Sequence, residues 1–142
     1  MSIPELKNKF SGRAILRAMH YFEENERVEA LREAIRSGDE EFAYELISSS
    51  GESSYKKLQN CYAEGDPSET IPLALALCGE LEGVLAYRVH GGGFAGTILA
   101  FVENECADNF HDYMAHVFGD ANVYRLKIRN EGGTRLDLGE ND

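Results

Sequence analysis

A cluster of glycines between two apolar segments constrains the fold of this chain more than any other feature. Four glycines lie within residues 91–96, between Val84–Val89 and Ile98–Val102, and both flanking segments have the composition of strands. Glycine loses much backbone entropy on folding, so a cluster persists where the chain needs a positive φ or a close approach. The sequence predicts a β-hairpin whose loop either meets a ligand or simply tolerates glycine as a loose turn.

The spelling of the loop also matches a nucleotide-binding motif, but its setting does not. Gly91, Gly93 and Gly96 give the pattern G-x-G-x-x-G. In a dinucleotide-binding fold this pattern opens a helix, whereas residues 97–102 are β-branched and apolar. A phosphate-binding G-x-x-x-x-G-K-[ST] loop is excluded too, because no lysine follows the last glycine. The pattern therefore predicts strand, loop, strand.

Length and composition indicate one domain, covering residues 1–142, with 43% hydrophobic residues. The net charge of −11 argues against nucleic acid or an anionic membrane as a partner. The three cysteines have no C-x-x-C spacing, which favours reduced thiols and a cytoplasmic location. No apolar signal region and no uncharged run of about 18 residues is present, so no membrane segment is expected.

The first half of the chain predicts two helices. Apolar residues at helical spacing indicate one long amphipathic helix over Arg13–Ser37, ended by Gly38. Asp39 is suited to cap the second helix. The hydroxyl-rich stretch Ser48–Ser54 predicts a break in that helix, and residues 55–61 a short helical turn. The predicted buried face of the second helix consists of Phe42, Leu46 and Ile47.

The second half predicts an α+β unit. Pro72 begins a helix that extends to Leu81, and the spacing of Phe110–Phe118 predicts another helix with one buried stripe. Val123–Ile128 and Thr134–Leu138 suggest a third and a fourth strand. The predicted fold is therefore α+β, with a roughly four-stranded antiparallel sheet packed against helices.

Few residues form a pattern that indicates chemistry. Arg88 and His90 lie beside the glycine loop, where they are either a contact for an anion or ordinary surface residues. The other histidines have no metal-ligand spacing and are interpreted as structural, so no metal site is predicted. The serines lack a G-x-S-x-G elbow, and no catalytic residue is assigned. The predicted functional element consists of His90, Gly91, Gly92, Gly93, Phe94, Ala95 and Gly96, with Arg88 as a possible anion contact.

Residues along nearly the whole chain resemble the C-terminal half of galactokinases. The resemblance rests on Arg13, Ala14, His20, Glu24, Arg27 and Val28, on Gly38 and Asp39, and on residues 88–96. The resemblance implies that the chain is the C-terminal domain of a sugar kinase of the GHMP superfamily, with a ferredoxin-like fold. The glycine loop would then correspond to the third signature motif of that superfamily. His90 stands where the family usually has threonine, and Ala95 where it has glycine. A family histidine is missing at residues 50–53, and residues 60–69 depart from the usual Ser-Cys-Pro-Glu pattern.

The resemblance also implies what the intact enzyme would do. It would transfer the γ-phosphoryl group of MgATP to a sugar hydroxyl, with the glycine loop facing both substrates. The family's phosphate loop, sugar-binding motif and catalytic residues lie in an N-terminal kinase domain that this sequence lacks. The implied partners are that domain, the sugar and ATP, and the chain alone is expected to be inactive and to hold no cofactor tightly. The alternative is a stand-alone, non-catalytic ligand-binding or regulatory module of the same topology.

Overall fold

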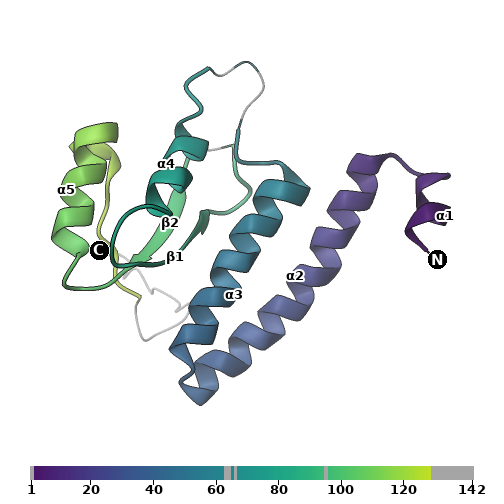
Figure 1. The fold of residues 1–142 in the computed structure, drawn as a ribbon, viewed down its shortest axis with the longest axis horizontal. Helices are drawn as coiled ribbons and strands as arrows, with labels where there is room; N and C mark the ends of the chain where they lie inside the picture. Colours follow the sequence, from purple (N-terminus) through teal and green to yellow (C-terminus); the bar gives the residue numbers. More distant parts are fainter. Residues whose placement is uncertain (1, 63–64, 66, 95, 129–142) are drawn as a thin grey trace, which may run out of the picture.

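Two long helices form one side of the molecule. The computed structural model describes residues 2–62, 65, 67–94 and 96–128 (Figure 1). After a short helix α1 (Ile3–Lys7), helix α2 (Gly12–Ser37) ends at Gly38, whose φ of 74° is left-handed. Asp39 caps α3 (Glu40–Ser53), because its carboxylate accepts the backbone N–H of Phe42 at 3.2 Å. The predicted long helix and its cap are confirmed, and α2 and α3 lie side by side (Figure 1).

The serine-rich stretch does not break α3, and this prediction was wrong. The helix continues to Ser53 and passes into a π-helical turn, η1 (Ser54–Leu58). The hydroxyls of Ser50 and Ser53 bond side chains of α2 instead of competing for the backbone of their own helix. Small residues therefore form the buried face of α3 toward its neighbours.

The predicted burial of Phe42 was wrong for the same geometric reason. Phe42 is 43% exposed, whereas the adjacent Ala43 is buried. Gly51, two turns further along, lies so close to β1 that an added Cβ would be 2.8 Å from the carbonyl oxygen of Tyr87. The helix approaches the strand through small side chains, which turns Phe42 away from the packed face.

The glycine cluster connects two antiparallel strands, as predicted. Helix α4 (Thr70–Cys78) is followed by β1 (Val84–Val89) and β2 (Ile98–Val102), in which Val89 pairs with Ile98. The register shifts between Val84 and Ala86. Helix α5 (Ala107–Phe118) and a 3-10 turn, η2 (Asp120–Asn122), complete the described elements.

The apolar core lies around this hairpin. One buried cluster joins Cys61 and Val89 to two residues of α4, Ile71 and Leu75. A second joins α4 to Met114 of α5, with β1 and β2 residues packed against it. In Figure 1 the hairpin lies between α5 and the α2–α3 pair, and α3 contacts β1 directly. The glycine loop therefore projects from strands that border both buried clusters.

The α+β class is confirmed, but the described residues contain a two-stranded sheet instead of a four-stranded one. The predicted third strand was wrong: residues 123–128 form no strand, and Tyr124, Leu126 and Ile128 are 76%, 76% and 83% exposed. An alternating segment buries one face only where a partner strand and a covering layer are supplied, and no described strand pairs with it. The predicted fourth strand, Thr134–Leu138, lies outside the described residues. No helix in the described part of the chain is long and apolar enough to cross a bilayer.

Candidate functional site

The glycine loop has the left-handed backbone that its sequence requires. The backbone N–H of His90 donates to the carbonyl oxygen of Thr97 at 3.0 Å, which closes the base of the loop. Gly91, Gly93 and Gly96 have φ values of 62°, 74° and 77°, which side chains strongly disfavour. Within the described residues the loop therefore depends on glycine at three of its positions.

The side chains that belong to the predicted site differ in their placement. His90 is exposed, as are Gly91, Gly92 and Gly96, while Gly93 is half-buried. Phe94 is 58% exposed and has a positive φ of 55°, which is uncommon for a residue with a side chain. Ala95 lies outside the described residues. The described part of the loop thus presents backbone, the imidazole of His90 and the ring of Phe94 to its surroundings.

Asn60, which the sequence did not indicate as a site residue, holds the glycine loop by hydrogen bonds. Asn60 is only 4% exposed, and its Nδ2 donates to the carbonyl oxygen of Gly92 at 3.1 Å. Its backbone carbonyl accepts the N–H of Phe94 at 3.0 Å. No local signal relates position 60 to a loop 32 residues away, because the contact exists only after folding.

Arg88 is held within the protein. Its Nη1 donates to the hydroxyl of Ser50 at 2.7 Å and lies 3.6 Å from the carboxylate of Glu24. Its Nε donates to the carbonyl oxygen of Val89 at 3.1 Å. The guanidinium links β1 to α3 and α2, and 28% of the side chain is exposed. A contact between Arg88 and an anion stays a prediction.

Glu24 is the centre of this polar network. Its carboxylate accepts the hydroxyl of Ser50 at 2.5 Å and the Nε of Arg27 at 2.9 Å. Burial alone would raise the pKa of Glu24, but the hydrogen bonds and the charges of Arg27 and Arg88 lower it overall. The residue is therefore ionised where α2, α3 and β1 meet.

Two further contacts extend the network along α2. The Nδ1 of His20 lies 3.0 Å from the hydroxyl of Ser53, and burial lowers the pKa of His20. Lys57 of η1 forms a close ion pair with Glu23. Helix α2 is thus joined to α3 and η1 by hydrogen bonds and ion pairs. The interpretation of His20 as a structural residue stays a prediction.

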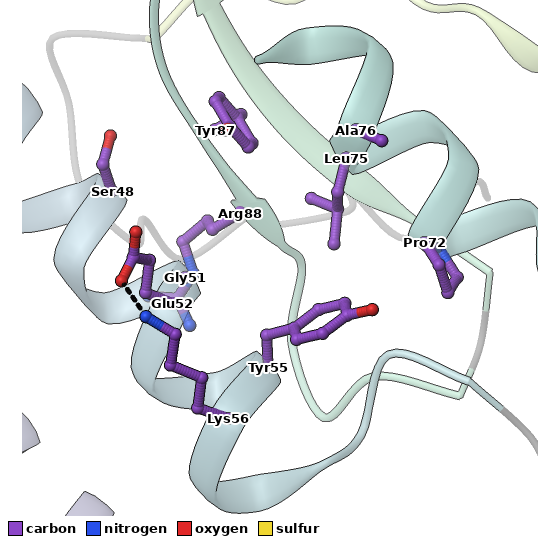
Figure 2. Close-up of a pocket in the computed structure, with 10 residues that line it drawn as sticks. All are labelled: Ser48, Gly51, Glu52, Tyr55, Lys56, Pro72, Leu75, Ala76, Tyr87 and Arg88. Atoms are coloured by element: carbon purple, nitrogen blue, oxygen red, sulfur yellow. Dashed lines mark hydrogen bonds and ion pairs between the residues drawn. The ribbon is translucent and has the colours of Figure 1, made fainter.

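A pocket of about 310 Å³ opens beside this network, between α3, η1, α4 and β1. Figure 2 shows Tyr55 of η1, Leu75 of α4 and Tyr87 of β1 among the residues that line it. Its charged groups include Lys56 and Glu52, which pair with each other at 2.6 Å. The pocket thus offers apolar surface with the Lys56–Glu52 pair and Arg88 as its charged groups.

An apolar groove of about 580 Å³ lies along α1 and α2. Phe10 and Phe22 line it, and they are 54% and 67% exposed. Helix α2 is amphipathic, as predicted, yet its buried residues are Ile15 and Ala34 alone. The stripe is longer than the surface that α3 covers.

Comparison with known proteins gives relatives of one kind. No family model matches the chain. It is 43% identical over 98 residues to a galacturonokinase of Arabidopsis thaliana, covering 69% of this chain and 22% of that protein. It is 33% identical over 110 residues to a galactokinase of Lactobacillus helveticus, covering 78% of this chain and 27% of that protein.

A solved structure agrees with these relatives at the level of the fold. The Lactococcus lactis galactokinase complexed with galactose matches with a TM-score of 0.64 and 24% identity. The match covers 85% of this chain and 31% of that one. The chain therefore spans 22% to 31% of the length of these proteins.

The α+β arrangement, with a glycine-loop hairpin beside paired helices, is therefore the fold found in part of a galactokinase. More narrowly, the chain is a galactokinase-like domain of the GHMP kinase type, as its resemblance on the helix and hairpin motifs implied.

Proposed function

We propose that this chain is the C-terminal, substrate-facing domain of an ATP-dependent sugar kinase of the galactokinase type. In the intact enzyme the γ-phosphoryl group of MgATP passes to a sugar hydroxyl. The observation that carries the proposal is the identity of 43% to a galacturonokinase and 33% to a galactokinase over most of this chain. The comparisons do not favour the alternative of a stand-alone, non-catalytic module.

The glycine loop supplies geometry in this reaction. Phosphoryl transfer depends on positioning and charge stabilisation more than on proton transfer by the protein. Exposed backbone at Gly91 and Gly92 can approach a substrate closely because no side chain intervenes. With 25 acidic against 14 basic residues, the chain itself supplies little charge to neutralise a triphosphate. We therefore assign the catalytic residues and the ligands of Mg²⁺ to the N-terminal kinase domain.

The partner in this proposal is that N-terminal domain. The groove along α1 and α2 is an apolar surface of the kind that marks protein contacts. Phe10 and Phe22 are more than half exposed there, so a domain seated on the groove would remove both rings from water. Reduced thiols at Cys61, Cys78 and Cys106 support a cytoplasmic location for the assembly.

A domain exchange tests the proposal. This chain would replace the matching segment of the Lactobacillus helveticus galactokinase, and ADP release would be followed with galactose and with galacturonic acid. We expect sugar-dependent turnover by the chimera and none by the 142-residue chain alone. The galactokinase without its matching segment is the control. Turnover by the isolated chain, or a folded chimera without activity on either sugar, would contradict the proposal.

A further inference from the structure

Asn60 joins the glycine loop to the core through two separate hydrogen bonds. It follows η1 and Gln59, whose left-handed φ of 58° turns the chain toward the hairpin. The side chain donates from Nδ2 to the oxygen of Gly92, and the main-chain oxygen accepts from the N–H of Phe94. A buried asparagine that forms hydrogen bonds through both its side chain and its main chain links the segment after η1 to the glycine loop.

The Asn60 carboxamide has a second, weaker contact on its other side. The thiol of Cys61 donates to its Oδ1 at 3.8 Å. Cys61 is 1% exposed within the cluster that includes Val89, and burial raises the pKa of this thiol, which keeps its proton. Because Oδ1 faces the thiol, the NH₂ group of Asn60 is directed toward Gly92.

The loop in turn is shaped to fit Asn60. A Cβ added to Gly93 would lie 2.1 Å from the main-chain oxygen of Asn60 and 2.8 Å from its Nδ2. By contrast, a Cβ added to Gly91 or Gly92 would meet nothing within 4 Å. Phe94, with its positive φ, directly follows this contact. Asn60 therefore contacts the loop at the glycine that has no room for a side chain and at the non-glycine residue with a left-handed φ.

We infer that Asn60 is the positioning residue of the glycine loop, acting on substrates only through Gly92, Gly93 and Phe94. A free loop of this composition would sample many backbone states, and ordering it beforehand lowers the entropy lost in binding. The function of this positioning rests on the kinase activity proposed above. The structural contact itself can be measured without it.

Hydrogen exchange of the full chain by NMR tests the contact. Asn60→Ala removes the carboxamide and keeps the main-chain oxygen, so exchange of the Phe94 amide should quicken about three- to tenfold, the loss of one hydrogen bond. Asn60→Asp places an acceptor oxygen against the carbonyl oxygen of Gly92, and it replaces the alanine variant in this measurement if that variant does not fold. The matched control is Asn122→Asp, since Asn122 also donates to a backbone carbonyl, that of Phe118, but far from the loop. Unchanged exchange at Phe94 in a folded Asn60 variant would overturn the inference.

The same substitutions in the chimeric kinase test the effect on the reaction. We expect Asn60→Ala to lower kcat/KM at a temperature where the variant is fully folded, and Asn122→Asp to leave it unchanged. A faster Phe94 exchange with unaltered kcat/KM would overturn the positioning role in the reaction. An inactive unsubstituted chimera contradicts the kinase proposal alone, because the exchange measurement still decides whether Asn60 orders the loop.

Discussion

Helices α2 and α5 are both amphipathic, but they are attached to the molecule by different means. Met114 of α5 is buried in an apolar cluster with residues of α4. Helix α2 keeps Phe22 exposed, and the side chains of Glu24 and His20 join it to α3 by hydrogen bonds. An apolar stripe in sequence therefore does not establish which contacts hold a helix. The uncovered stripe of α2 is surface available to another domain.

The largest expected effect separates these two attachments. Met114→Ala should lower the free energy of unfolding by about 2–5 kcal/mol, because it leaves a cavity in a buried cluster. Phe22→Ala should change it by less than about 0.5 kcal/mol in the isolated chain, since the ring is already 67% exposed. Urea denaturation of both variants measures the difference. Comparable losses in the two variants would show that the ring of Phe22 is packed.

A smaller effect is expected from the polar attachment of α2. Glu24→Gln removes the charge that faces Arg27 and Arg88, and it should cost about 1–2 kcal/mol after allowance for partial exposure. Glu29→Gln is the matched control, because Glu29 pairs with Arg32 on an exposed face of the same helix. Its cost should be below about 0.5 kcal/mol. Equal costs in urea denaturation would mean that the network contributes no more than a surface pair.

The smallest effect is a dependence on pH. The folded state lowers the pKa of His20, so its contribution to stability is complete above the ordinary value of 6.5 and falls as pH drops through it. The pKa of Glu24 is also lowered, so its contribution is lost as pH falls below about 4.5. The unfolding free energy of the wild type should decline between pH 7.5 and 5.5, and His20→Gln should remove part of that decline. A decline of unchanged size in the variant would assign it to other groups.

The sequence predicted the elements whose signals are local. Residues within a few positions of each other determine the helical spacing of α2, its end at Gly38 and the cap of α3 at Asp39. The same holds for both strands of the hairpin. The hydroxyls of Ser50 and Ser53 were misinterpreted because their partners are 26 and 33 residues away. Such partners remove the competition with the helix backbone that the serines alone suggest.

The candidate site divides in the same way. A glycine-rich hairpin loop was predictable, since positive φ values and close approaches restrict the residue type at each position. Asn60 was not, because an asparagine after a helical turn is common and its bond to Gly92 arises only from the tertiary fold. The strand predicted over residues 123–128 was wrong for a related reason. Alternating apolar and polar residues give a segment two different faces, but they do not supply a strand for it to pair with.

The contact between Asn60 and Gly93 also limits which substitutions this loop can accept. The oxygen that would collide with a side chain at position 93 belongs to the main chain of Asn60, which every residue type carries. A second-site change at position 60 therefore cannot make room, and a selection for suppressors of Gly93→Ala should return glycine at 93. The carboxamide of Asn60, by contrast, can be replaced without a steric clash, and its replacement costs the hydrogen bond to Gly92. The two partners of one contact thus differ in how freely each can vary.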